Sequence, residues 1–282
     1  MWSGKFFAED GTEGMRAFVF PGQGGGVIEP EAWLLPTIRQ VVGEHIPEQV
    51  KLFARAAQDA DESRELDLHP DVVAGHSLGE YAAAHAAGSL GLDDGARLVA
   101  ERDRLMTQAA RENPGGMVAL IGADPLEVAR AAEEAQGVVV AANFNTPRQT
   151  VISGEIAALE AVGGSVGGRR VHLGVAAAFH SPLMVAASRA MELLLADVEF
   201  RDPVVPMVSA TDGGVLETAD DVRRALQKQM LSPVRWVAVI GRFLDMGVEE
   251  IIEAGEDGTL IRMLRDFGRK EIKGHKAREV LA

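Results

Sequence analysis

The 282-residue chain contains no cysteine, which excludes disulfide bonds, thiolate nucleophiles and cysteine-ligated metal sites. Basic residues are also few, because 28 Lys and Arg stand against 42 Asp and Glu and give a formal net charge of −14. Nucleic-acid phosphates and anionic membrane surfaces repel such a chain. No apolar run approaches the roughly 20 residues needed to cross a bilayer. We therefore expect a cytoplasmic protein that binds neither nucleic acid nor a membrane.

Two common ligand-binding signatures are also missing from the sequence. No pair of histidines has His-x-x-x-His spacing, so no metal site is expected. A glycine-rich segment over residues 20–26 follows an apolar run, but it lacks the Lys-Ser/Thr of a P-loop and the glycine spacing of a Rossmann motif. We therefore expect no tightly bound nucleotide or metal cofactor.

Short apolar segments followed by helical segments recur along the chain, which is typical of an α/β fold. Over residues 114–177 the predicted order becomes strand, helix, strand, strand, helix, strand, which is the ferredoxin-like order. We expect a large α/β domain formed by residues 15–113 and 178–282. A small ferredoxin-like domain, residues 114–177, is inserted into it, and residues 1–14 form an N-terminal extension.

The pentapeptide Gly75-His76-Ser77-Leu78-Gly79 has the Gly-x-Ser-x-Gly pattern of a nucleophile elbow. It follows an apolar run and precedes an alanine-rich helical segment, which is the strand–turn–helix context that the motif needs. A serine at a helix N-terminus lies where developing negative charge is favoured. We interpret Ser77 as a nucleophile rather than as a serine that caps the helix in a glycine-rich turn.

A serine nucleophile needs a general base, and the chain offers seven histidines, at positions 45, 69, 76, 85, 172, 180 and 275. Spacing alone does not select among them. His180 is of interest because it lies where the chain is expected to return from the small domain to the large one. A side chain at that place can face a cleft between the two.

Six motifs occur in a fixed order between about residues 16 and 265. They are Phe20-Pro21-Gly22-Gln23-Gly24, the serine motif extended to Glu80-Tyr81, Gly116-Met117-Val118-Ala119, the segment 143–154 (NFNTPRQTVISG), the segment 178–184 (AFHSPLM) and the segment 229–236 (QMLSPVRW). Together they resemble malonyl-CoA:acyl carrier protein transacylases and the acyltransferase domains of polyketide and fatty acid synthases. The resemblance implies that the large domain is α/β-hydrolase-like, with a mostly parallel sheet.

The resemblance also implies roles for individual residues. Ser77 takes the acyl group from coenzyme A as an ester, and His180 is its general base. A main-chain carbonyl near Gln229 orients the imidazole, so that no acid completes a triad. The backbone N–H groups of Gln23 and Leu78 form the oxyanion hole.

Three further residues are implied to line the substrate pocket: His76, Asn145 and Phe179. Leu78 after the serine and Phe179 before the histidine match the malonyl-type members of the family. Phe179 narrows the pocket beside the α-carbon of the acyl group. Because a pocket rejects one extra methyl group by only about 1–3 kcal/mol, this is a preference for malonyl.

The family's carboxylate-binding arginine falls on Arg102, and the helical pattern around this residue supports that assignment. Apolar residues recur at helical spacing over 98–109, and Arg102 falls on their stripe, whereas the neighbouring charged residues fall on another face. An arginine on a buried face is costly unless it meets an anion. The alternatives are an internal ion pair or a side chain that extends to solvent.

These residues favour a ping-pong acyltransferase that moves a malonyl or related carboxylated group from coenzyme A to the phosphopantetheine thiol of an acyl carrier protein, in fatty acid or polyketide biosynthesis. The coenzyme A thioester is then a substrate. One alternative is an editing acyl hydrolase or esterase with the same Ser77–His180 pair. Others are a transferase for an unusual acyl unit held on a carrier protein and a non-catalytic docking subunit. Arg102 favours transfer, because clearing neutral acyl chains requires no buried cation.

Some parts of the chain depart from the family pattern. The stretch from Gln23 to Ser77 is short, Gly25-Gly26 replaces the usual Ser-Gln, and Glu256-Asp257 replaces the usual Pro-Gly. Basic residues concentrate over 262–278, where an acidic carrier protein could dock in spite of the overall negative charge. Arg148 and Arg169-Arg170 are rival docking sites.

Overall fold

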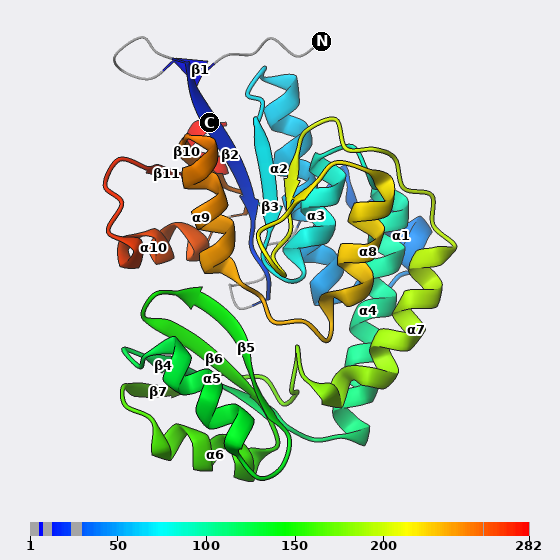
Figure 1. Ribbon diagram of the computed structural model, residues 1–282. Coiled ribbons are helices and arrows are strands. Elements are labelled where there is room, and N and C mark those ends of the chain that lie inside the picture. Colours follow the sequence, from blue (N-terminus) through cyan, green and yellow to red (C-terminus); the bar gives the residue numbers. More distant parts are fainter. Residues whose placement is uncertain (1–5, 8–12, 24–29, 256, 282) are drawn as a thin grey trace.

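The computed structural model describes residues 6–7, 13–23, 30–255 and 257–281, which form two β-sheets and the helices around them (Figure 1). Most of the expected extension over residues 1–14 lies outside the described residues. Its described residues are strand β1 (Phe6–Phe7) and the first two residues of β2 (Glu13–Phe20), with which β1 pairs antiparallel. The strand therefore begins two residues before the expected start at Met15.

The larger sheet has the strand order β11-β10-β2-β3-β8-β9, with β1 beside β2. Its further strands are β3 (Val72–Gly75), β8 (Met207–Val208), β9 (Val215–Leu216), β10 (Val248–Glu253) and β11 (Lys273–Lys276). The five strands from β11 to β8 run parallel, whereas β9 is antiparallel to β8. A mixed α/β fold with a largely parallel sheet is thus confirmed.

Helices cover both faces of this sheet. Alternate residues of the central strands point to opposite faces, so each central strand contributes to two cores. Phe18, Phe20 and Val73 pack in one core, and Ala17 and Val19 pack in the other. The first core involves α1 (Leu35–Val42), α2 (Glu48–Glu65), α3 (Gly79–Ala86), α4 (Leu92–Glu112), α7 (Val185–Ala196), α8 (Ala219–Gln229) and α11 (Ala277–Val280). The second involves α9 (Trp236–Met246) and α10 (Thr259–Leu264). Two short 3-10 helices are η1 (Pro182–Met184) and η2 (Arg265–Phe267).

The smaller sheet has the order β5-β6-β4-β7, and its paired strands are all antiparallel. Its elements are β4 (Gly116–Ile121), α5 (Pro125–Glu134), β5 (Val139–Thr146), β6 (Gln149–Gly154), α6 (Ile156–Ser165) and β7 (Arg169–His172). Both helices pack on one face of the sheet, while residues of the other face, such as Met117 and Val151, pack near Phe179. In Figure 1 this sheet lies below the larger one.

The two sheets are joined by a short run of main-chain bonds around Val234. The Val234 N–H donates to Ala142 O at 2.8 Å, and the Phe144 N–H donates to Val234 O at 2.7 Å. The Arg235 guanidinium lies 5.0 Å from the centre of the Phe144 ring, which adds a cation–π contact. These contacts fix β5 against the segment before α9. None of the helices in the described part of the chain is long and apolar enough to cross a membrane.

The turn between β3 and α3 depends on two glycines. A Cβ at Gly75 would lie 2.1–2.2 Å from backbone atoms of Gly79 and Glu80, and a Cβ at Gly79 would lie 2.0 Å from Phe20 O. No side chain fits at either position without moving the backbone. The strand, the turn and the helix can therefore pack this closely only because both positions are glycine.

We predict that Gly75→Ala destabilises the protein by about 3 kcal/mol or more, because the new methyl group collides with backbone that cannot yield. Gly164→Ala is the matched control, since that helical position has open space around it. The control should gain about 0.5–1 kcal/mol from helix propensity. Urea unfolding followed by circular dichroism measures both, and equal stability of the two variants would contradict the prediction.

Candidate active site

Ser77 lies in the turn between β3 and α3 with a φ of +52°, a left-handed conformation that non-glycine residues rarely adopt. Leu78 follows it as the N-cap residue of α3, so its N–H is among the helix N-terminal donors that have no acceptor within the helix. The strained turn thus presents the serine hydroxyl beside the positive end of a helix. His180 also has a left-handed backbone, with a φ of +56°.

Ser77 and His180 are brought into direct contact, although 103 residues separate them in the chain. The Ser77 Oγ lies 2.8 Å from His180 Nε2. The other ring nitrogen, Nδ1, lies 3.0 Å from both Gln229 O and Ser232 O. Because carbonyl oxygens only accept, Nδ1 carries the proton and Nε2 is left to accept the proton of the serine hydroxyl. Main-chain carbonyls therefore hold the imidazole where many serine enzymes use an acid.

The surroundings of His180 keep its ring neutral. Burial, followed by the nearby positive charge of Arg102, lowers the pKa of His180 to about 4, against the opposing effect of the two carbonyl acceptors. A neutral imidazole at pH 7 can take a proton from Ser77, which a protonated ring could not do.

Arg102, on α4, is 1% exposed, and its guanidinium is held by neutral partners. Nη2 donates to Ser77 Oγ at 3.1 Å, Nη1 donates to Gln49 Oε1 at 2.6 Å, and Nε donates to Gln229 Oε1 at 3.3 Å. Within the described part of the chain, no carboxylate forms an ion pair with it, which argues against the internal ion pair considered from the sequence. A buried cation beside the nucleophile is therefore available to an incoming anion.

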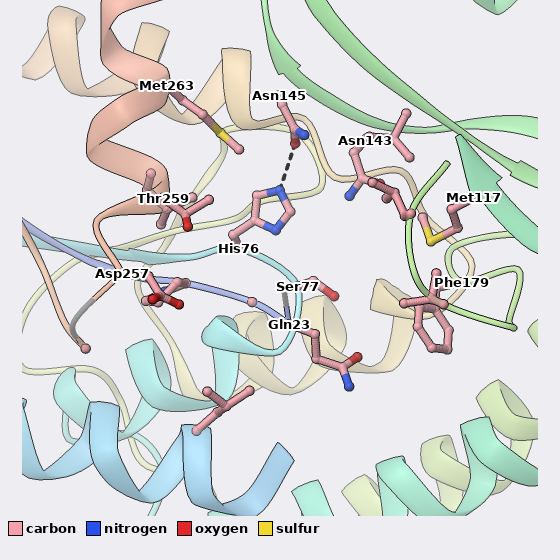
Figure 2. A pocket seen from close by; sticks show the side chains of 18 of the residues that line it. Gln23, His76, Ser77, Met117, Asn143, Asn145, Phe179, Asp257, Thr259 and Met263 are labelled. Carbon is pink, nitrogen blue, oxygen red and sulfur yellow. Dashed lines mark hydrogen bonds between the residues drawn. The ribbon is translucent and has the colours of Figure 1, made fainter. Parts of the chain in front are cut away.

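A cavity of about 180 Å³ opens beside the serine and is shown in Figure 2. Both sheets contribute to its wall. The larger sheet and its loops provide Gln23, His76 and Ser77, and the smaller sheet provides Met117 and Asn145. Phe179 and His180, from the segment that joins β7 to η1, also line it, as do Asp257, Thr259 and Met263.

His76 links the two sheets at this cavity. Asn145 Nδ2 donates to Gln149 Oε1, so Asn145 Oδ1 accepts the hydrogen bond from His76 Nε2 at 2.9 Å, drawn as a dashed line in Figure 2. Burial lowers the pKa of His76, which keeps this ring neutral as well. His76 and Asn145 therefore lie at the cavity together.

Gln23 lies in the loop after β2, near Ser77 in Figure 2. The loop is packed closely on the serine turn, because the His76 N–H donates to Phe20 O and a Cβ at Gly22 would lie 2.7 Å from His76 O. Gln23 and Leu78 thus come from two segments that meet beside the serine. Gly25-Gly26 and Glu256, two of the departures noted in the sequence, lie outside the described residues.

Comparison with known proteins identifies similar sequences and similar structures among acyl transferases. The family model for the acyl transferase domain matches residues 46–281. The chain belongs to this family. A malonyl CoA-acyl carrier protein transacylase of Synechocystis is 33% identical over 269 residues, which cover 86% of this chain and 90% of the relative. The crystal structure of a Synechocystis malonyl-CoA:ACP transacylase superposes with a TM-score of 0.84 and 30% identity, covering 93% of this chain and 96% of the other.

A second acyl transferase relative, the malonyl CoA-acyl carrier protein transacylase of Escherichia coli K12, is 38% identical over 197 residues. The match covers 68% of this chain but 64% of the relative. This chain therefore corresponds to less than two thirds of the length of that relative.

Two residues that contact the acyl transferase site were given no role from the sequence. Gln49, on α2, accepts from Arg102, and Glu80, on α3, accepts a hydrogen bond from the Gln229 side chain at 2.7 Å. The side chain of Gln229 was itself missed, since the sequence pointed only to its main chain. A signal for Glu80 was present, because it is a charged residue at the start of an alanine-rich, buried helix. Among the described residues, no cluster of three or more potential metal ligands occurs.

We predict that the His180 imidazole stays neutral, with its proton on Nδ1, until the pH falls to about 4. Heteronuclear NMR of ¹⁵N-labelled protein measures this, with His180→Ala used to assign the signal. The exposed His172 provides a solvent-accessible imidazole in the same spectrum. A midpoint near the ordinary histidine value of about 6.5 would contradict the prediction.

Proposed function

We propose that the protein transfers a malonyl or related carboxylated acyl group from coenzyme A to the thiol of an acyl carrier protein. The observation that carries this proposal is the position of Arg102, whose Nη2 lies 3.1 Å from the Oγ of a serine that is paired with a histidine. A nucleophile with a buried cation beside it suits an acyl group that ends in a carboxylate. The names of the acyl transferase relatives describe the same reaction.

In the first half-reaction, Ser77 Oγ attacks the thioester carbonyl carbon while its proton passes to His180 Nε2. The backbone N–H groups of Gln23 and Leu78 stabilise the oxyanion that forms on the carbonyl oxygen. The carbon–sulfur bond then breaks, and the coenzyme A sulfur leaves with the proton from His180. Ser77 is left as an acyl ester. Gln229 O, which accepts from Nδ1, stabilises the transient imidazolium.

In the second half-reaction, the thiol of the carrier protein gives its proton to His180 and attacks the ester carbonyl. The ester bond breaks, and Ser77 Oγ recovers a proton from His180. The acyl group is now a thioester on the carrier. Since coenzyme A leaves before the carrier thiol reacts with the acyl ester of Ser77, the mechanism is ping-pong.

Arg102 recognises the carboxylate of the acyl group in this scheme. When Ser77 Oγ becomes an ester oxygen, it is a poorer acceptor for Arg102 Nη2, so this donor turns to the substrate carboxylate together with Nη1. The planar fork then binds both carboxylate oxygens. His76, Asn145 and Phe179 line the pocket around the acyl chain, and Phe179 narrows it toward malonyl rather than a branched unit.

The proposed division into two domains also fits a reaction at Ser77. We propose an α/β-hydrolase-like domain over residues 15–113 and 178–282 and an inserted ferredoxin-like domain over residues 114–177. The antiparallel order β5-β6-β4-β7 with two helices on one face supports the second assignment. The inserted domain covers the serine with Met117 and Asn145, so that the acyl group reacts between the two domains.

The partner that this reaction requires is an acyl carrier protein, and the coenzyme A thioester is a substrate, with no tightly bound cofactor. We place carrier docking at the basic residues over 262–278, because this segment begins within α10, which lines the cavity through Thr259 and Met263. A cytoplasmic location, where coenzyme A thioesters are made, fits this function. An editing hydrolase would share Ser77 and His180, but the neutral acyl chains that it clears have no carboxylate for Arg102 to bind.

We predict that brief mixing with malonyl-CoA adds one malonyl group to the protein, and that an added carrier protein removes it. Ser77→Ala should show no adduct, because the acyl acceptor is gone. Intact-protein mass spectrometry measures both, with acetyl- and methylmalonyl-CoA run in parallel to rank the donors. Release of free acid and coenzyme A without a lasting adduct would indicate the hydrolase instead.

We predict that Arg102→Ala lowers the acylation rate with malonyl-CoA by about 100-fold or more, since two charge-assisted hydrogen bonds are lost. The rate with acetyl-CoA should change far less, which also shows that the variant is folded. Arg104→Ala, on the exposed face of the same helix, is the matched control. Equal losses for the two donors would rule out carboxylate recognition by Arg102.

A further inference from the structure

Glu80 is a carboxylate that is 1% exposed, and it lies three residues after the nucleophile. Its two oxygens have separate partners. Oε1 accepts from the Ala210 N–H at 3.0 Å, and Oε2 accepts from Gln229 Nε2 at 2.7 Å. Neither partner is a cation, so Glu80 is not simply neutralised by an ion pair. Its partners instead require both of its oxygens to be acceptors.

Gln229, which Glu80 holds, touches each of the three residues that the proposed reaction uses. Its main-chain O accepts from His180 Nδ1 at 3.0 Å. Its side-chain Oε1 accepts from Arg102 Nε at 3.3 Å, and its Nε2 donates to Ser77 O at 2.9 Å as well as to Glu80. The orientation of this one amide therefore affects where the Arg102 guanidinium lies.

The amide of Gln229 has only one orientation that satisfies its neighbours. A flip would place Oε1 against the Glu80 carboxylate and the Ser77 carbonyl, which are both acceptors. The same flip would place Nε2 against Arg102 Nε, so that two donors would face each other. Buried donors and acceptors left in this way cost about 1–3 kcal/mol each. Glu80 thus selects the orientation in which Gln229 accepts from Arg102.

We propose that Glu80 is a positioning residue that acts through the Gln229 side chain to hold Arg102 in the geometry that accepts a carboxylated acyl group. Glu80 touches neither the substrate nor the reacting atoms. Its effect is on the choice of donor rather than on the chemistry of Ser77 and His180. The inference rests on the proposed function, because it assumes that Arg102 binds the carboxylate.

The charges around Glu80 fit this arrangement. The pKa of Glu80 is raised to about 7, because burial and, to a smaller extent, Asp212 outweigh the lowering by the hydrogen bonds from Gln229 and the Ala210 N–H and by the charge of Arg102. Above pH 7 the carboxylate is ionised and accepts from both partners. A proton on either oxygen of Glu80 would face a hydrogen-bond donor. An assay at pH 8.5 therefore examines Glu80 as the ionised carboxylate, which accepts at both oxygens.

The test is Glu80→Gln, which keeps the shape of the side chain but turns one acceptor into a donor. The new amide faces a donor either at Ala210 N or at Gln229 Nε2, which weakens the preference of Gln229 for its present orientation. At pH 8.5 we expect kcat/KM for malonyl-CoA to fall about 10–100-fold, mainly through KM, and that for acetyl-CoA to fall less than 3-fold. Glu133→Gln, an exposed carboxylate on α5, is the control and should change neither value.

Gln229→Ala extends the test to the residue through which Glu80 is proposed to act. Whatever it does to the absolute rates, it should lower the ratio of kcat/KM for malonyl-CoA to that for acetyl-CoA, and adding Glu80→Gln to it should change this ratio no further. If Glu80→Gln fails to fold, as judged by circular dichroism, Glu80→Asp replaces it, because the shorter side chain moves the carboxylate away from Gln229 and should lower the same ratio. An unchanged ratio in Gln229→Ala overturns the inference.

Other outcomes also overturn the inference. Equal losses for the two donors would mean that Glu80 only supports the fold. Faster reaction of Glu80→Gln with malonyl-CoA would mean that Glu80 acts through its negative charge rather than through Gln229. A further selective loss in the double variant would mean a route that bypasses Gln229. If the wild-type protein forms no malonyl adduct, the proposed function itself fails, which separates that failure from the others.

Discussion

The Ser77 hydroxyl forms two hydrogen bonds of opposite direction. It donates to His180 Nε2, and its oxygen accepts from Arg102 Nη2. This arrangement requires a cation that is almost fully buried and that forms no ion pair with a carboxylate in the described part of the chain, which is unfavourable. The rest of the site offsets that cost. Gln49 and Gln229 supply neutral acceptors to the guanidinium, and main-chain carbonyls hold the imidazole. Burial, together with the same positive charge, lowers the pKa of His180 and so keeps its ring neutral and able to act as a base.

Contacts between the two sheets hold the residues around Ser77 in place. Main-chain bonds around Val234 attach β5 to the segment that follows Gln229, and His76 reaches across to Asn145. The strands that carry the cavity wall are thus attached directly to the serine turn. In the proposed reaction two thiols use one serine in turn, and such a site benefits from fixed walls, because preorganised donors need no rearrangement during the reaction.

Several features could be predicted from local sequence. The pattern of residues 72–87 predicted a strand, a tight turn and a helix, and the structure shows β3, Ser77 in a left-handed turn and α3. The order of strands and helices over residues 114–177 also agrees with the sequence pattern. These features depend on periodicity and on glycines that permit close approach, both of which are properties of a few neighbouring residues. The choice of His180 among seven histidines required the resemblance, because spacing does not bring distant residues together.

By itself, the sequence determined the alternation of strands and helices, the serine turn, and the apolar stripe that buries Arg102. Only the tertiary structure decided which groups meet the buried guanidinium. Gln49 and Gln229 are 53 and 127 residues away from Arg102, and each stands on a different helix. Glu80 contacts Gln229 across 149 residues. A helical pattern shows that a side chain is buried, but its hydrogen-bond partners depend on how the helices pack, which no local pattern contains.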